Sequence, residues 1–250
     1  MRNRARIGDL VGSGRRADVY AYEDGEAAGE DGAPDGSGGG GGAWVLRRYR
    51  DGRGDVSDAA AVMEYVRGYG YPVPRVRTAG SRTDLVLERL TGPTVLAAME
   101  AGALTAAEGA AVLVRLLDEL HTIPARLSAD PGVRVLHLDL HPDNVVLTPA
   151  GPMVIDWDNT EEGPPGLDWG MSAVLLAQVA VAEDDPRAGP ARDVLAALLA
   201  GCPDPAVLTG RHGQLVQARQ RRAADPATGP AEAVLLGDAE RLIRGLLDTG

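Results

Sequence analysis

The chain has 250 residues, a hydrophobic content of 44% and a formal net charge of −11. This length is enough to bury a substantial core in one domain or in two lobes. The acidic balance argues against a nucleic-acid partner, since phosphate binding requires a basic face, whereas it would suit a cationic small molecule or serve only solubility.

Two residue types narrow the chemistry by their scarcity. All 25 Lys and Arg positions are arginine, which excludes a P-loop lysine and a Schiff-base lysine. The single cysteine, Cys202, excludes an intrachain disulfide and a cysteine-based zinc site. The N-terminus lacks the apolar segment of a signal peptide, and no apolar run reaches membrane-spanning length. We therefore expect a cytoplasmic protein without membrane contact.

The first predicted element is a hairpin. Residues 7–11 and 17–22 have the composition of strands, and Gly12-Ser13-Gly14 lies between them. The backbone N–H groups of Gly12 and Gly14 at its tip could lie over phosphates, although Gly-x-Gly alone favours a plain hairpin turn. The dinucleotide-binding fingerprint is excluded, because a strand and not a helix follows.

A low-complexity segment interrupts the strands. Residues 25–42 are mostly small and acidic and cannot bury enough apolar surface to become ordered, so we expect a flexible loop there. Residues 44–49 form the third predicted strand. Its period of two puts Val45 and Arg47 on one face and Arg48 on the other.

A helix and a second hairpin complete this region. The helix is expected over 55–67, and the hairpin strands over 75–78 and 85–90. Gly92 and Pro93 then break the chain. We place the boundary there, which gives an N-terminal nucleotide-binding lobe at 1–90 and a C-terminal catalytic and substrate-binding lobe at 91–250.

The apolar pattern becomes helical from residue 93 onward. The expected helices span 94–101, 105–121, 167–182, 191–200, 206–223 and 231–247. A strand-rich first third followed by a helix-rich remainder predicts an α+β fold of two lobes, with a small antiparallel sheet in the first and mainly helices in the second.

One polar loop stands out within the helical region. It runs from His137 to Asn144, is flanked by short apolar strands, and is followed by a further strand that ends at Asp156. One Asp to orient a hydroxyl, with an amide and a carboxylate to hold Mg²⁺, is the minimum set for phosphoryl transfer from ATP. Asp139, Asn144 and Asp156 supply that set.

Two other interpretations of the loop stay open. His137, Asp139 and His141 have the alternating spacing of a zinc site, and Asp and Asn are also common as ordinary turn residues. Both are less favoured, because Asn144 and Asp156 offer hard oxygen ligands that suit Mg²⁺.

Several motifs along the chain together resemble a known family. They are the Gly-x-Gly hairpin, Val45-Leu46-Arg47, Tyr71-Pro72-Val73-Pro74, Leu87-Glu88-Arg89-Leu90 with Gly92, Leu120-His121 with Pro124, the loop from His137 to Asn144, and Ile155-Asp156-Trp157. Over nearly its whole length the chain resembles the aminoglycoside phosphotransferase and choline kinase-like family, distant relatives of protein kinases. The resemblance implies a bilobal protein-kinase-like fold.

The resemblance also implies catalytic roles. Asp139 matches the catalytic base, which accepts or orients the proton of the substrate hydroxyl. Asn144 and Asp156 match the Mg²⁺ ligands. Asp168 is similar to a family Asp that braces the loop from below, and His137 shapes the loop.

The nucleotide-binding roles fall on the first lobe. Arg47 matches the basic residue that binds phosphates, and Gly12 and Gly14 would cover them. The segment containing Glu88 and Leu90 resembles the hinge, where their backbone groups would meet adenine. The implied cofactors are ATP and Mg²⁺.

Three positions depart from the family pattern. The phosphate-binding residue is Arg47 and not lysine, although arginine keeps the charge and can fork onto two phosphate oxygens. The helix acid that should pair with it falls near Ala59, while Asp58 is adjacent and Glu64 lies away from the expected face. Asp143 stands where glycine is more usual.

These residues predict an enzyme that moves the γ-phosphoryl group of ATP to a hydroxyl of a small molecule. The acceptor, whether an aminoglycoside, a sugar, an amino alcohol or another metabolite, is not readable from the sequence. The alternative is a non-catalytic nucleotide-binding sensor on the same fold.

Overall fold

The structure, a computed structural model, describes residues 6–14, 17–23, 44–50, 55–78, 81–211, 213–226 and 228–249. The loop expected over 25–42 lies outside these residues. The chain divides into two compact units, Met1–Glu64 with Val73–Leu90, and Tyr65–Pro72 with Thr91–Gly250.

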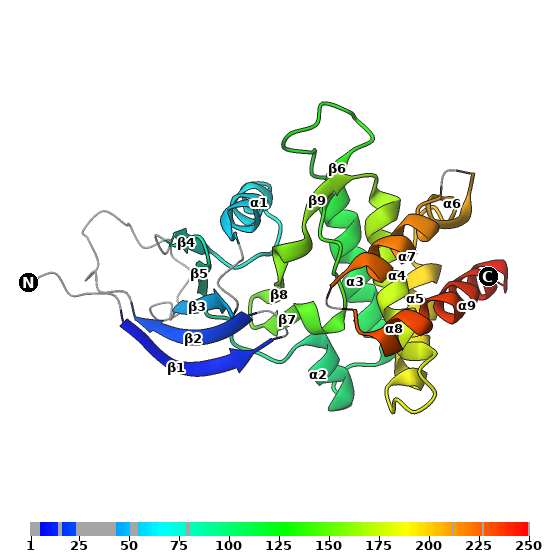
Figure 1. Ribbon diagram of the computed structural model, residues 1–250, viewed down its shortest axis with the longest axis horizontal. Helices are drawn as coiled ribbons and strands as arrows, with labels where there is room; N and C mark the ends of the chain where they lie inside the picture. Colours follow the sequence, from blue (N-terminus) through cyan, green and yellow to red (C-terminus); the bar gives the residue numbers. More distant parts are fainter. Residues whose placement is uncertain are drawn as a thin grey trace, which may run out of the picture. The chain divides into compact units, whose positions relative to one another are not determined.

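An antiparallel sheet forms the centre of the first unit (Figure 1). Its strands, in spatial order, are β1 (Arg6–Ser13), β2 (Ala17–Glu23), β3 (Trp44–Tyr49), β5 (Asp84–Glu88) and β4 (Val76–Thr78). The expected strands of both hairpins are therefore present within a residue or two of their predicted ends. Helix α1 (Ser57–Gly68) follows β3 and buries an apolar stripe that includes Val62 and Met63.

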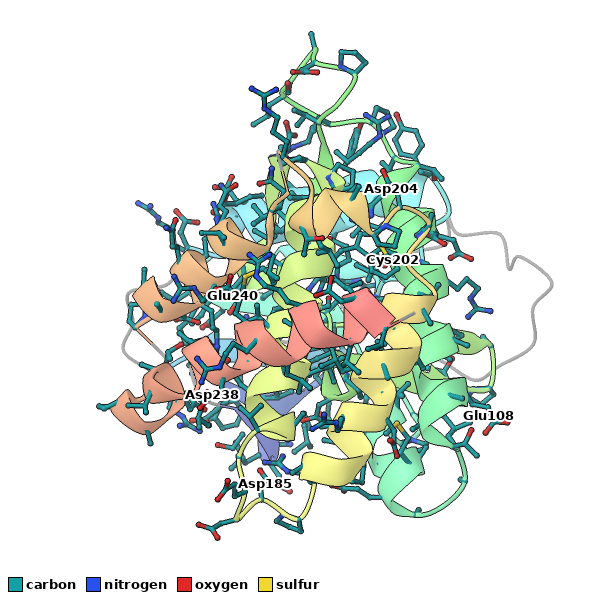
Figure 2. The ribbon with its side chains drawn as sticks, turned by 90° about the vertical axis from the view of Figure 1, so that its right-hand side faces the viewer. Glu108, Asp185, Cys202, Asp204, Asp238 and Glu240 are labelled. Carbon is teal, nitrogen blue, oxygen red and sulfur yellow. The ribbon has the colours of Figure 1, made fainter. Side chains whose placement is uncertain are left out.

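Helices make up most of the second unit. They are α2 (Val95–Glu100), α3 (Ala106–His121), α4 (Pro165–Ala180), α5 (Ala188–Ala200), α6 (Ala206–Thr209), α7 (Leu215–Ala224), α8 (Pro230–Val234) and α9 (Leu236–Thr249). Helix α4 is buried along most of its length and contacts α5, α7 and α9. Figure 2 looks onto this layer, in which α9 crosses α4 and carries the labelled Asp238 and Glu240. Among the described helices, none combines the length and apolar character that a membrane crossing requires.

Two of the expected helices are each broken in two. The helix predicted over 206–223 is interrupted between α6 and α7, where a Cβ on Gly213 would lie 2.2 Å from the backbone oxygen of Leu208. Such a close approach of two backbone segments is available only to glycine. The helix predicted over 231–247 is likewise divided into α8 and α9 by a turn at Leu235.

Two small sheets and two 3₁₀ turns carry the polar loop of the second unit. Strands β7 (Val145–Thr148) and β8 (Gly151–Val154) pair as a hairpin, as expected. Strand β6 (Arg134–Leu136) pairs with β9 (Glu161–Gly163), a strand that the sequence pattern did not predict. The turns are η1 (Pro142–Asn144) and η2 (Trp157–Asn159).

A glycine fixes the start of α2 against this hairpin. Gly92 has φ +144°, and a Cβ there would lie 1.9 Å from the backbone oxygen of Leu147. The N–H of Leu147 donates to the Pro93 oxygen at 2.8 Å. The break predicted at Gly92 and Pro93 is thus a point of close backbone contact.

Helix α3 begins with the capping box expected at Thr105. The Thr105 hydroxyl accepts from the Glu108 N–H at 3.2 Å, and the Glu108 carboxylate accepts from the Thr105 N–H at 2.8 Å. We expect Thr105→Ala to lower the free energy of unfolding by about 1 kcal/mol, because one N–H group of the first turn loses its acceptor. Urea unfolding measures this loss. Thr249→Ala, in the last turn of α9, is the control and should change stability by less than about 0.5 kcal/mol; equal effects would contradict the capping role.

Candidate active site

The β7–β8 hairpin brings Asn144 and Asp156 together. Val145 pairs with Val154, and the N–H of Ile155 donates to the Asn144 oxygen at 3.0 Å. Asn144 therefore lies beside Ile155, and Asp156 is the next residue. The two side chains proposed as metal ligands sit at one end of this small sheet.

Asn144 also reaches back to Asp139. Its Nδ2 donates to the Asp139 backbone oxygen at 2.8 Å and lies 3.5 Å from Asp139 Oδ2. Because the amide nitrogen faces Asp139, Asn144 Oδ1 is the atom left to act as a cation ligand. His141 Nε2 lies 3.9 Å from Asp139 Oδ1 on the other side of the carboxylate. By backbone position, Asp139, Asn144 and Asp156 thus form one cluster.

The backbone is strained at two positions in this cluster, one next to Asp139 and the other at Asp156. Among the described residues, Leu138 and Asp156 are the two non-glycine residues with positive φ, at 61° and 64°. A left-handed conformation costs an L-residue about 1–2 kcal/mol, so the surrounding structure must hold each of them. One of these residues precedes Asp139, and the other is itself a proposed metal ligand.

A buried carboxylate holds the first strained residue. Asp168 in α4 is fully buried and accepts from the Leu138 N–H at 2.7 Å and from the His137 N–H at 2.9 Å. His121 Nε2, at the end of α3, lies 3.1 Å from the same carboxylate. Burial by itself would raise the pKa of Asp168, but the bonds from His121 and the His137 backbone outweigh it, and the pKa lies below its usual value.

Buried aromatic rings hold the second strained residue. Trp157, next to Asp156, donates its indole N–H to the Val154 oxygen at 3.1 Å. Its ring meets His137 edge-on at 4.8 Å between centroids and Tyr71 at 5.8 Å. These contacts anchor the turn that presents Asp156.

His137 is engaged on both ring nitrogens. Nδ1 accepts from the Asp139 N–H at 3.2 Å, so Nε2 carries the proton and donates to the Ile155 oxygen at 3.0 Å. Burial lowers the pKa of His137, which keeps its ring neutral. Its two nitrogens therefore serve the loop and not a zinc ion. Within the described ranges, no three His, Cys, Asp or Glu side chains are placed to hold a metal together.

Asp143 forms a contact that glycine could not make. Its carboxylate accepts from the Thr94 hydroxyl at 2.9 Å, and that hydroxyl also caps α2 by accepting from the Ala97 N–H at 3.1 Å. The departure from the family pattern at Asp143 therefore links η1 to the start of α2.

In the first unit, the hairpin between β1 and β2 contains Gly12 and Gly14 as expected. Neither has positive φ, and added Cβ atoms would lie 3.9 Å from Val19 Cβ and 3.5 Å from the Ala17 oxygen, respectively. These distances are ordinary van der Waals contacts. The hairpin by itself therefore does not require glycine at either position.

The two arginines of β3 face opposite sides of the sheet, as the strand period predicts. Arg47 pairs with Val19 and Leu85 and shares their face. On the other face, Arg48 makes two bonds to the Asp84 carboxylate, from Nε at 2.9 Å and from Nη2 at 2.7 Å. This fork lowers the pKa of Asp84.

Helix α1 offers no carboxylate on its buried face. The buried positions are apolar and include Ala59, where the family register would place an acid. Asp58 and Glu64 are both exposed.

The predicted hinge residues, Glu88 and Leu90, lie at the C-terminal end of the first unit. Strand β5 ends at Glu88, whose carboxylate accepts from the backbone and the guanidinium of Arg75, each at 3.2 Å. The side chain of Glu88 is therefore engaged by Arg75, and the contact with adenine predicted for this residue would come from its backbone. Leu90 is half-buried and is the last residue of the unit.

Two solved structures share this fold. A thermostable mutant of the aminoglycoside phosphotransferase APH(4)-Ia, in its apo form, aligns with a TM-score of 0.55 at 12% identity and covers 98% of this chain and 95% of its own. Amicoumacin kinase hAmiN, in complex with AMP-PNP, Ca²⁺ and Ami, aligns with a TM-score of 0.52 at 16% identity and covers 97% and 88%. The expected α+β, protein-kinase-like fold is confirmed.

One family model matches part of the chain. Residues 88–211 match the model of the phosphotransferase enzyme family, APH. The resemblance to aminoglycoside phosphotransferases is thereby confirmed. No curated protein matches the chain. The family match and the kinase-like neighbours together support a small-molecule kinase.

Proposed function

We propose that the chain is an ATP- and Mg²⁺-dependent phosphotransferase that moves the γ-phosphoryl group to a hydroxyl of a small molecule. The observation that carries the proposal is the cluster of Asp139, Asn144 and Asp156, held on two strained backbone positions. Strain of this kind persists where the surrounding structure over-determines it, and it gathers at functional sites.

The donor atoms of the cluster suit Mg²⁺. They are an amide oxygen and carboxylate oxygens, and Mg²⁺ binds through one or two carboxylates together with substrate phosphates. Asn144 Oδ1 and the Asp156 carboxylate would hold the ion. When bound, Mg²⁺ neutralises the charge that develops on the transferred phosphoryl group.

The remaining roles belong to the side chains themselves. Asp139 accepts the proton of the acceptor hydroxyl. The oxygen of that hydroxyl attacks the γ-phosphorus, and ADP departs. Arg47 binds phosphate oxygens, and the tip at Gly12 and Gly14 covers them with backbone N–H groups. The backbone of Glu88 and Leu90 binds adenine. Catalysis is then mainly orientation and electrostatics.

The acceptor is proposed as a hydroxyl-bearing small molecule. One of the two solved structures described above is an aminoglycoside phosphotransferase, and the other is an amicoumacin kinase. An aminoglycoside-like compound is therefore the first class to test, followed by sugars and amino alcohols.

The test is a phosphorylation screen with Mg·ATP over aminoglycosides and hydroxyl-bearing metabolites. A phosphorylated acceptor, detected by mass spectrometry, with matching ADP formation supports the proposal. If the protein binds Mg·ATP but neither transfers nor slowly hydrolyses it, the chain is a nucleotide sensor, the alternative that the apolar face of α1 favours. If it binds no nucleotide, both functions fail.

The metal role has a separate test. We expect Asp156→Asn to raise the Mg²⁺ concentration needed for half-maximal activity by about 10–100-fold, because one ligand oxygen and its charge are lost. Activity is measured across a Mg²⁺ titration. The control is Glu64→Gln, an exposed acid of α1, which should leave the titration unchanged. An unaltered Mg²⁺ requirement in Asp156→Asn would contradict the assignment.

A further inference from the structure

We infer that Tyr49 positions Arg47 for phosphate binding. The inference rests on the proposed function, since it concerns how this chain prepares its phosphate-binding arginine. It assigns a positioning role to a residue that no motif contains.

The two side chains lie on the same face of β3. They are two residues apart in the strand, and the Arg47 guanidinium carbon lies over the Tyr49 ring, 5.0 Å from its centroid. An arginine within about 6 Å of an aromatic centroid is attracted by the electron-rich face of the ring. The stack therefore fixes where the end of a long, flexible side chain lies.

In the proposed arrangement, Tyr49 meets the flat face of the Arg47 guanidinium. A guanidinium presents its N–H groups in its own plane, whereas the contact with a ring uses its flat face. A stacked arginine can therefore still fork onto two phosphate oxygens.

The ring of Tyr49 is itself well placed to act as a support. Its backbone is held from both sides, since Tyr49 pairs with Ala17 of β2 and its N–H donates to the Thr83 oxygen at 3.2 Å. The ring is half-buried.

The test measures nucleotide binding without turnover. Isothermal titration calorimetry with Mg·AMP-PNP and with adenosine compares wild type, Tyr49→Leu and Tyr49→Phe. We expect Tyr49→Leu to weaken Mg·AMP-PNP binding by about 5–30-fold and to leave adenosine binding unchanged, because only the phosphates meet Arg47. Tyr49→Phe keeps the aromatic face and should bind within about twofold of wild type.

A double-mutant cycle separates positioning from a structural effect. If Tyr49 acts through Arg47, then Tyr49→Leu should cause no further loss in an Arg47→Ala background. The matched control is Tyr20→Leu, a half-buried tyrosine on the opposite face of the sheet, which pairs with Leu46 and should leave Kd unchanged.

The outcomes distinguish the two levels of the hypothesis. A wild-type protein that binds neither ligand overturns the proposed function and this inference with it. A wild type that binds Mg·AMP-PNP, with Tyr49→Leu equal to it, overturns the role of Tyr49 alone. An additive loss in the cycle, or equal weakening of adenosine binding, also overturns that role.

Discussion

Replacing Asp139 with asparagine is expected to lower kcat for phosphoryl transfer by about 10²–10⁴-fold, the usual contribution of a positioned general base. The amide has the size of the carboxylate but cannot accept the proton of the acceptor hydroxyl. The shorter bond from Asn144 Nδ2 to residue 139, at 2.8 Å, goes to the backbone oxygen, so the substitution leaves it in place, whereas the contact at 3.5 Å involves the altered side chain. Initial rates of acceptor phosphorylation give kcat, and calorimetry gives the Kd for Mg·AMP-PNP, which should stay within about threefold of wild type because the metal ligands are unchanged.

The control for this prediction is Asp193→Asn, an exposed carboxylate on α5. This substitution also replaces a carboxylate with an amide in the second unit, and it should leave both kcat and Kd unaltered. Full turnover by Asp139→Asn would remove Asp139 from the reaction. A loss of nucleotide binding that parallels the loss of kcat would instead point to a distorted loop.

The core of the candidate site is predictable from sequence because its geometry is local. Asp139 and Asn144 belong to one short loop, and Asn144 and Asp156 bracket a tight hairpin whose register pairs Val145 with Val154. Once that hairpin forms, strand geometry alone places Asn144 beside Ile155, the residue before Asp156. Spacing in the sequence therefore translates directly into contact.

The supports of the site are not predictable in this way. Asp168 comes from α4 and accepts from the Leu138 N–H, and His121 comes from α3 and contacts the same Asp168 carboxylate. A sequence pattern indicates that Asp168 lies in an apolar helix, but not which N–H groups it accepts. The family resemblance suggested a bracing role for Asp168, and the geometry adds His121 to it.

A second long-range contact shows the same limit. The carboxylate of Glu162, in the unpredicted strand β9, accepts from the backbone N–H groups of Arg126, Leu127 and Ser128 at distances between 2.6 and 3.1 Å. Strand β9 is too short and polar to show a period. It forms because β6 and this loop offer donors and acceptors that only the folded chain brings near.

Asp168→Asn is the substitution for which we expect the largest loss of stability, about 3–5 kcal/mol, since it breaks a buried, hydrogen-bonded charge. Asp168 Oδ2 lies within 3.1 Å of both His121 Nε2 and the His137 N–H, and Oδ1 accepts from Leu138. The asparagine amide has a single acceptor oxygen. Its NH₂ group would replace the other carboxylate oxygen and would face N–H donors that it cannot accept from. Urea unfolding followed by tryptophan fluorescence measures the loss, since Trp157 and Trp169 are both buried in this unit.

The same carboxylate should give an acid-dependent signature. Because the pKa of Asp168 is lowered in the folded protein, its contribution is complete above the ordinary value of 3.8 and is lost as the pH falls through the folded pKa. The difference in unfolding free energy between wild type and Asp168→Asn should therefore be largest near neutral pH and shrink below about pH 4.

Asp118→Asn is the matched control for this last prediction, one turn before His121 on α3. Burial raises the pKa of Asp118, so its charge costs stability at neutral pH and its removal should be neutral or slightly stabilising. A wild-type urea midpoint for Asp168→Asn, with kcat retained, would show that Leu138 keeps its strained backbone without this carboxylate. Asp168 would then not be what positions Asp139, because the bond from the Leu138 N–H to Asp168 Oδ1 is the contact that this substitution alters.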